Sequence, residues 1–458
     1  MNDKKFSKEL KSILFYVLEY GMRNIPFKLS MDALKQPELK REFISKVHKG
    51  FMLAQNLIIQ NLLLLGKEKA KNKDMIKESN RQQKSKDVIQ GLKQDLKRIE
   101  YQENVLRKIA DTIAWQILNN DITVIRRLYN FSSQVEIYNS NLKHDLQVVE
   151  EMFEKDNETF PLITDITSFI QIGDLLIKDR NVIKVVELKE GKVNEEISNM
   201  LDEHFEFKCD RKLFFELEEK GEKFQKQFFR YVKQQSTALN SVGIINRGEG
   251  TDSQGRKIKI IDDVFYTKHF TETVESMLEK VNKRNYSINY IENCLAIGVY
   301  NVSRIPIHTA FEAWKKSIDI DFPTVDIRAF INGSVTHPLF LHPFSLDDKV
   351  KLVMGKKVIL MSLNINEWLK MFERKNAVVR LLSKKETARL NNTPNHLKAF
   401  EYNGQAIEIE HSNIKQIIHD GIFERMFNQF LTPSSAVDFL IQANSAGFSE
   451  LSEVTKRE

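Results

Sequence analysis

The chain has 458 residues, of which 41% are hydrophobic and 29% charged, a composition typical of a globular protein and not of a disordered or fibrous one. Its length predicts about three domains. The 69 basic and 63 acidic residues leave a net charge of +6, which permits a nucleic-acid partner without requiring one. The two cysteines, Cys209 and Cys294, are too few for a disulfide framework or a four-cysteine metal centre, so we expect a reducing, cytoplasmic location.

The first 100 residues predict a helical N-terminal region, because apolar residues recur at spacings of three and four and Pro26 and Pro37 fit short connections. The most hydrophobic stretch, residues 51–65, contains glutamines and asparagines and falls short of the roughly 20 apolar residues that span a bilayer. No membrane anchor is therefore expected.

Residues 67–100 carry eleven Lys or Arg against six Asp or Glu. This segment predicts a long surface helix with a basic face. Such a face is either a solvated surface or a contact for phosphate backbones, and the sequence leaves both interpretations open.

Short apolar runs rich in β-branched residues indicate strands from 160 to 188, and helical spacing returns over 194–205 and 213–238. A glycine-rich loop at 246–255 marks a domain boundary. Beyond it we expect an α+β region of unknown role, 241–443, with helices at 270–283 and 364–374 and strands at 351–353 and 358–363. A flexible tail follows at 444–458.

Residues 172–192 carry the strongest chemical signal. A polar turn at 178–181 between two apolar runs predicts a β-hairpin, and pairing Ile177 with Val182 sets Asp174 opposite Val185. Glu187 is then the diagonal neighbour of Asp174, about 7–8 Å away, and Lys189 lies on the same face. Two carboxylates at this distance suit one divalent ion.

A hard cation held by Asp174 and Glu187, with the backbone carbonyl of Leu188 as a further ligand, suits phosphodiester hydrolysis. It neutralises charge on the phosphate and lowers the pKa of an attacking water. Lys189 then supplies positive charge that orients the water or stabilises the transition state.

At this point the sequence resembles the PD-(D/E)XK nuclease superfamily, through Asp174 and Glu187-Leu188-Lys189. Gly173 before the aspartate and Gly191 after the lysine are similar to glycines at these positions in the RecB-like branch. Gln227 with Tyr231 resembles the Gln-x-x-x-Tyr motif of that branch. The resemblance covers about residues 100–240. It implies a restriction-endonuclease-like α/β core with a central mixed sheet over 101–240, a Mg²⁺ or Mn²⁺ cofactor, and a substrate groove lined by Gln227 and Tyr231.

Many members of this superfamily place one more ligand on a helix before the first strand. Four residues compete for that role here, Glu103, Asp111, His144 and Glu150, and the sequence does not choose among them. His337 and His342 each precede a proline, which favours an extended packing segment over a metal site. No nucleotide-binding P-loop sequence is present.

The expected function is metal-dependent hydrolysis of phosphodiester bonds, with DNA favoured over RNA. By analogy with the family, it fits a bacterial antiviral defence or DNA-processing effector. Two alternatives remain: a catalytically inactive protein of the same fold that binds nucleic acid or acts as a scaffold, and an RNA nuclease. A partner protein or a homo-oligomer is also compatible with the sequence.

Overall fold

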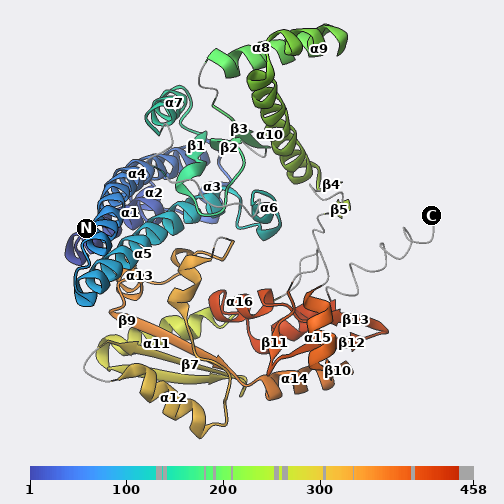
Figure 1. Cartoon of the computed structure of the whole chain (residues 1–458). Helices are drawn as coiled ribbons and strands as arrows, with labels where there is room; N and C mark the ends of the chain where they lie inside the picture. The colour runs from blue at the N-terminus through green and yellow to red at the C-terminus, as the bar shows by residue number, and fades with distance from the viewer. Residues whose placement is uncertain are drawn as a thin grey trace. The chain divides into compact units, whose positions relative to one another are not determined.

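The computed structural model describes residues 1–129, 137, 142–179, 182–188, 192–207, 210–251, 257–259, 267–302, 306–333, 335–392 and 398–442. They belong to two compact units, Met1–Asp262 (unit 1) and Asp263–Glu458 (unit 2). The fold is mixed α and β, as expected, with the longest helices in unit 1 (Figure 1). The predicted regions 1–100 and 101–240 both lie in unit 1, and the predicted boundary loop at 246–255 lies near its end.

Unit 1 is mainly helical. Its helices are α1 (Asp3–Leu18), α2 (Tyr20–Arg23), α3 (Met31–Leu34), α4 (Pro37–Arg81), α5 (Lys86–Ile117), α6 (Ile122–Arg127), α7 (Leu142–Lys155), α8 (Lys192–Phe207), α9 (Asp210–Glu219) and α10 (Glu222–Arg247). Its strands are β1 (Phe160–Ile163), β2 (Leu175–Asp179), β3 (Val182–Val186), β4 (Glu249–Thr251) and β5 (Lys257–Lys259).

Helices α1, α4 and α5 pack together and confirm the helical N-terminal region. Apolar residues of α1 at helical spacing, such as Phe6, Leu10 and Ile13, are fully buried, which is the pattern of an amphipathic helix against a core. Pro37 is the first residue of α4, where its missing N–H has no helical partner to lose. None of the described helices has an apolar stretch long enough to cross a bilayer.

The long surface helix predicted over 67–100 is wrong. The segment is instead the tip of a helical hairpin, in which α4 ends at Arg81 and α5 begins at Lys86. Gln83 lies in the connection with a φ of 50°, a left-handed conformation that no α-helix continues. Helix α5 therefore packs back along α4 instead of extending into solvent.

Strands β1, β2 and β3 form an antiparallel sheet in sequence order. The hairpin predicted within 172–192 is confirmed, but its register differs by two residues: Leu175 pairs with Val186 and Ile177 pairs with Lys184. Lys178 and Asp179 continue the ladder instead of forming the turn. The side chain of Lys178 accommodates this by reaching Asn119, whose Oδ1 accepts its hydrogen bond at 2.8 Å.

The described strands of this region do not form the mixed sheet expected there, since every pairing among them is antiparallel. A parallel pair needs a long crossover, usually a helix. Here β1 and β2 are joined by residues 164–174, which contain only a short 3-10 turn, Thr164–Ile166.

The outer edge of β1 is satisfied by a side chain. Gln55 of α4 is fully buried; its Oε1 accepts from the N–H of Ile163 at 2.9 Å, and its Nε2 donates to the carbonyl of Pro161 at 3.4 Å. The amide thus replaces a neighbouring strand. It fixes the sheet against α4, and no described strand of unit 1 pairs with β1 on that side.

The single helix predicted over 213–238 is two helices, α9 and α10. The break is at Gly221, whose φ of 80° is outside the helical range. Helices α8, α9 and α10 share a small core of five residues: Ile197, Met200, Leu217, Phe228 and Tyr231.

Unit 2 alternates helices and strands. Its helices are α11 (Thr271–Lys283), α12 (Ile307–Ser317), α13 (Leu346–Val353), α14 (Ile365–Glu373), α15 (Lys384–Asn391) and α16 (Gly421–Asn428). Its strands are β6 (Tyr286–Ile291), β7 (Leu295–Asn301), β8 (Val325–Asp326), β9 (Lys357–Leu363), β10 (Val378–Leu381), β11 (Glu401–Tyr402), β12 (Gln405–His411) and β13 (Ile414–Ile417). Helix 270–283, helix 364–374 and strand 358–363 are confirmed to within one residue at each end.

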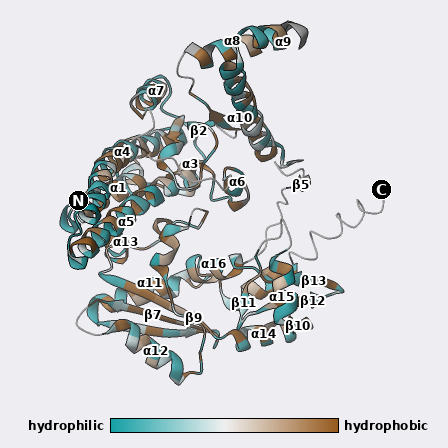
Figure 2. Ribbon diagram, in the orientation of Figure 1, coloured by the Kyte–Doolittle hydropathy of each residue, from teal (hydrophilic) through white to brown (hydrophobic). Residues whose placement is uncertain are grey.

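One antiparallel sheet of unit 2 has the order β6-β7-β9-β8, and the other joins β10, β11 and β13 to β12. Strands β7 and β9 are largely hydrophobic (Figure 2) and almost completely buried, as expected of central strands. The strand predicted at 351–353 is wrong, because these residues end α13. The Ser345 side chain accepts from the N–H of Asp348 at 3.1 Å and caps that helix.

We expect Gln55→Leu to lower the free energy of unfolding of unit 1 by about 2–3 kcal/mol, because a buried N–H and a buried carbonyl lose their partners. Hydrogen exchange of peptides spanning residues 160–166 measures this locally. Gln60→Leu, on the exposed face of the same helix, is the matched control, with an expected change within about 0.5 kcal/mol. Equal protection of β1 in both variants would contradict the role of Gln55.

His48 predicts a pH dependence of stability. Its ring lies beside Phe51 and Phe160, with centroids 6.2 and 5.9 Å away. Burial lowers the pKa of His48 from 6.5 to about 4, although a hydrogen bond to the carbonyl of Asn157 opposes the shift. Between about pH 4 and pH 6.5, His48 therefore binds a proton in the unfolded chain but not in the folded chain.

Stability of unit 1 should consequently fall as the pH is lowered from about 6.5 to about 4. Because His48→Gln removes the titrating group, the loss should be smaller in that variant. Thermal unfolding of both proteins across this range measures the difference, which cancels the contribution of other groups. Identical pH profiles would show that His48 is protonated equally in both states.

Candidate active site

Asp174 lies where β2 begins, and the backbone there is irregular. Its N–H donates to the carbonyl of Val186 at 2.9 Å, although Val186 is paired with Leu175. Asp174 and Leu175 thus both face Val186 of β3, which is a β-bulge. Gly173 precedes it with a φ of 66°, and a Cβ at Gly173 would meet Val185 at 2.3 Å, so only glycine fits this approach.

The bulge directs the Asp174 carboxylate to the adjacent strand end. Oδ2 of Asp174 accepts a hydrogen bond from the N–H of Leu188 at 2.6 Å. Leu188 directly follows Glu187 in the chain. The Asp174 carboxylate therefore lies beside the Glu187-Leu188 segment, in place of the predicted position opposite Val185, which pairs with Leu176.

Glu187 and Leu188 are half-buried, directly after β3. Since side chains alternate along a strand, Glu187 lies on the face of β3 that carries Ile183 and Val185. The structure therefore brings together Asp174, Glu187 and Leu188. Lys189 and Gly191 lie outside the described residues.

Helix α5 positions the segment that leads to Asp174. Nη1 of Arg107 donates to the carbonyls of Asp165 and Thr167 at 2.6 and 3.0 Å. Asp111 accepts from the N–H of Ser168 at 2.7 Å and from its hydroxyl. These contacts were not predicted, although charged residues within the apolar stripe of 105–117 are a sequence signal for buried pairing.

The four candidates for an upstream ligand differ in their surroundings. Asp111 is fully buried, with Lys108 at 3.0 Å in addition to its bonds to Ser168. Its carboxylate oxygens therefore join α5 to the turn at Ser168. Glu103 is paired with Lys69 at 2.9 Å and with Arg107 at 3.4 Å. His144 is half-buried and Glu150 exposed, both on α7.

Gln227 and Tyr231 lie on α10, as predicted, but in different environments. Nε2 of Gln227 donates to Oδ1 of Asn194 at 3.1 Å, and Asn194 follows the Glu187-Leu188 segment at the start of α8. The ring of Tyr231 is 6% exposed and belongs to the core shared by α8, α9 and α10. Gln227 is therefore hydrogen-bonded to the start of α8, the helix that follows the Glu187-Leu188 segment in the chain.

The donor set at the end of the hairpin consists of hard oxygen ligands, which suit Mg²⁺ or Mn²⁺. Oδ1 of Asp174, the carboxylate of Glu187 and the carbonyl of Leu188 are compatible with one cation that keeps several waters, as Mg²⁺ usually does. Within the described ranges, no three His, Cys, Asp or Glu side chains group closely enough to hold a metal ion.

His337 and His342 form a packing segment in unit 2, as predicted. His342 is buried between the rings of Phe344 and Phe430, with centroids 5.2 and 4.5 Å away. Its Nε2 donates to the carbonyl of Asn428 at 2.7 Å. Burial lowers its pKa well below the usual 6.5, so the ring is neutral.

The tip of the α4–α5 hairpin is basic and exposed. Among its exposed basic residues, Lys77 lies 3.8 Å from Asp74 and Arg98 lies 2.9 Å from Asp95. Exposed basic residues that form no ion pair within the described part of the chain are Lys67, Lys71, Arg81, Lys84, Lys86, Lys93 and Lys97.

Comparison with protein-family models, with curated proteins and with solved structures finds no match to this chain.

Tyr231 provides a direct test of core packing against a polar role. We expect Tyr231→Ala to lower the free energy of unfolding by about 3 kcal/mol, because it leaves a cavity between three helices. Tyr231→Phe keeps the ring and should cost less than about 1.5 kcal/mol. Phe229→Ala is the control, since Phe229 is 61% exposed. Urea unfolding, with hydrogen exchange of α8 to α10, measures all three; equal stability of Tyr231→Ala and wild type would refute the packing role.

Proposed function

We propose that this protein is a metal-dependent nuclease that hydrolyses phosphodiester bonds, with DNA as the favoured substrate. The observation that carries the proposal is the bulge at Asp174, which directs a carboxylate to the Glu187-Leu188 segment. The start of β2 requires a positive φ at Gly173 and buried charged residues on α5. Such backbone strain costs free energy of folding and is frequent at functional sites. Bulges are frequent beside active sites, where they re-aim a side chain.

The resemblance to the PD-(D/E)XK superfamily supports the same reading, since Asp174, Glu187 and Lys189 carry its motif. A restriction-endonuclease-like core belongs to this proposal. The antiparallel hairpin of β2 and β3 is the part of the described structure that agrees with it.

In this proposal Asp174, Glu187 and the carbonyl of Leu188 would hold a divalent cation, and the hydrogen bond from the N–H of Leu188 orients the Asp174 carboxylate. The cation supplies charge neutralisation at the phosphate and a bound water of lowered pKa. Lys189 contributes a compact positive charge beside the reacting phosphate. Gln227, which donates a hydrogen bond to Asn194 at the start of α8, is the residue of α10 that we propose contacts a substrate strand.

The exposed basic tip of the α4–α5 hairpin supports nucleic acid as the substrate. Lysines and arginines without acidic partners release counterions when they contact phosphates, which makes binding salt-dependent. Such contacts position a duplex without reading its sequence. The acidic residues of the same hairpin leave a positive excess, since residues 67–100 hold eleven basic and six acidic residues.

We expect the purified protein to cleave DNA with Mg²⁺ or Mn²⁺ and not with EDTA. Asp174→Asn should lower cleavage by about 100-fold or more, because it removes the charge while its amide oxygen still accepts from Leu188. Glu187→Gln should act similarly. Both variants should melt as wild type does.

Glu219→Gln, an exposed carboxylate of α9, is the matched control and should cleave normally. Linear, circular and single-stranded DNA and RNA, tested side by side, separate DNA from RNA and end-dependent from internal cleavage. Wild-type rates in Asp174→Asn and Glu187→Gln would refute the site. Metal-independent binding of DNA without cleavage would instead favour an inactive nucleic-acid-binding protein.

A further inference from the structure

Strand β6 of unit 2 has an open edge. It is the first strand of the order β6-β7-β9-β8, and within the described part of unit 2 no strand pairs with its outer side. The N–H of Asn301 donates to the carbonyl of Asn285 at 2.9 Å, which continues the β6–β7 register. Because bonding direction alternates along a strand, Ser287 and Asn289 bond to β7 while the backbone of Ile288 points outward.

The same alternation directs the backbone groups of Tyr286 and Tyr290 outward. Only one of these outward groups has a partner among the described residues, since the N–H of Tyr290 donates to the Asn289 side chain at 2.8 Å. A row of unpaired N–H and carbonyl groups is a template for another strand. The edge therefore offers hydrogen bonds centred on Ile288.

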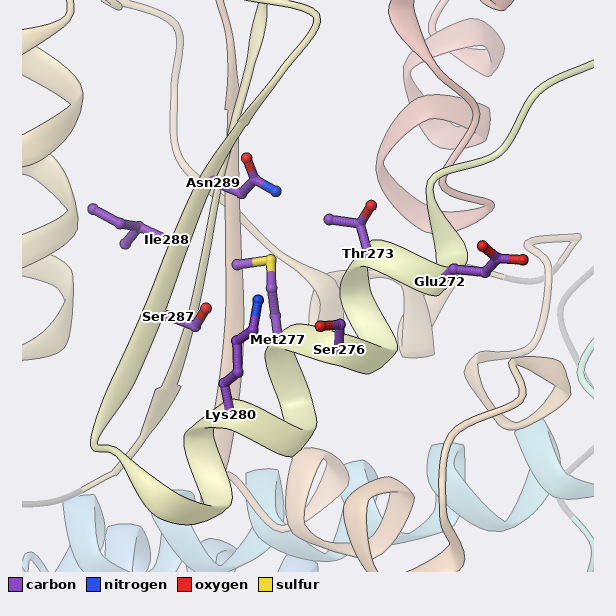
Figure 3. A pocket seen from close by; sticks show the side chains of 8 residues that line it. All are labelled: Glu272, Thr273, Ser276, Met277, Lys280, Ser287, Ile288 and Asn289. Atoms are coloured by element: carbon purple, nitrogen blue, oxygen red, sulfur yellow. The ribbon is translucent and has the colours of Figure 1, made fainter.

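A groove runs between this edge and α11 (Figure 3). Its volume is about 370 Å³, and it is lined by the helix on one side and by Ser287, Ile288 and Asn289 on the other. Figure 3 shows the side chains of Ser287 and Asn289 on the helix side of β6 and that of Ile288 on the far side. A second strand beside β6 would place its own polar side chains in this groove.

The charges of this groove are complementary to those of the same groove in a second copy of the chain. Glu272, Ser276 and Lys280 are spaced by four residues and share one face of α11. Lys280 lies at the Ser287 end of the groove, and Glu272 lies at the opposite end (Figure 3). Both are exposed, and neither has an ion-pair partner among the described residues. A two-fold axis near Ser276 and Ile288 would set Lys280 of each copy against Glu272 of the other.

The far face of β6 is complementary in the same way. Tyr286 is 57% and Ile288 40% exposed, an apolar surface at the end of the sheet. Under the same two-fold axis, Ile288 faces Ile288 of the second copy and Tyr286 faces its Tyr290. Apolar and aromatic cross-strand pairs stabilise antiparallel strands. Both faces of the strand thus fit a second copy of this chain.

We propose that β6 pairs antiparallel with β6 of a second copy, which forms a two-fold dimer and joins two four-stranded sheets into one. The contact is isologous, because the same residues serve both partners. It does not depend on the nuclease activity proposed for unit 1. An extended peptide from another protein is the competing occupant of this edge.

Sedimentation equilibrium of the full chain tests the proposal. We expect a dimer for wild type and a dissociation constant raised about tenfold or more in Glu272→Lys and in Lys280→Glu, because each places like charges opposite one another. The double variant Glu272→Lys with Lys280→Glu should restore the dimer. Restoration by a swap within one chain is specific to a two-fold contact.

A cross-link gives a second measurement that does not require tight association. Opposed residues of a hydrogen-bonded antiparallel pair have Cα atoms about 5.5 Å apart, which suits a disulfide. In a Cys209→Ser background, Ile288→Cys should therefore form a dimer on mild oxidation. Cys294 is fully buried and does not compete. Val378→Cys, at a 63% exposed position of β10, is the control.

A wild-type monomer at all accessible concentrations, together with no cross-link in Ile288→Cys, would overturn the proposal. A dimer that survives both single charge reversals would also overturn it, since the contact would then lie elsewhere. Equal cross-linking of Ile288→Cys and Val378→Cys would indicate random collision and count against it. The charge variants change exposed positions only, so loss of folding does not obscure their result.

Discussion

The candidate site of unit 1 depends on buried charge in α5. Arg107, Lys108 and Asp111 are almost completely removed from solvent, and burying such groups costs several kcal/mol each unless they are paired and hydrogen-bonded. The turn at 164–168 supplies the missing partners: two carbonyls bind Arg107, and Ser168 binds Asp111. Burial also lowers the pKa of the Arg107 guanidinium, against the neighbouring charge of Glu103. The helix and the turn therefore stabilise each other, and the turn fixes where β2 can begin.

From that point the geometry at Asp174 follows. Thr164 donates its N–H to the carbonyl of Asp174 at 2.9 Å, while the N–H of Asp174 is directed to β3 and its carboxylate to Leu188. A residue in a regular strand presents both backbone groups to the same side. Asp174 directs its N–H to β3 and its carbonyl to Thr164, on opposite sides. Its side chain is then close to Leu188, just beyond the end of β3. The Asp174 side chain completes the ladder where backbone pairing stops.

Sequence reasoning located this hairpin because its signal is local: two apolar runs, a polar turn and a period of two. It did not locate the register, because a shift by two residues keeps every side chain on its face and leaves the hydrophobic pattern unchanged. The bulge, the amide of Gln55 at the edge of β1, and the buried Arg107 were beyond the sequence for other reasons. The contacts of Gln55 and Arg107 join segments about 60 to 110 positions apart, and a single sequence carries no signal for which distant residues meet. The bulge depends on which backbone groups of two neighbouring strands are bonded, and the hydrophobic pattern does not specify this. The break at Gln83 was missed because a left-handed glutamine has no strong local preference.

In unit 2, the buried contacts of β9 fix the position of α11 beside the outer edge of β6. Lys357 of β9 is fully buried, bound to Asp348 and to Oδ1 of Asn282 at 2.8 Å, so it ties α11 and α13 to the central strand. With α11 held there, its polar face with Glu272, Ser276 and Lys280 stands beside β6 instead of covering it. An edge protected by its own fold is usually short, charged or capped, whereas β6 carries Tyr286 and Ile288 with their backbone groups outward. The polar face of α11 keeps this edge selective, because a neighbouring strand must present the opposite charge at each end of the groove, and a second copy does so in one orientation only.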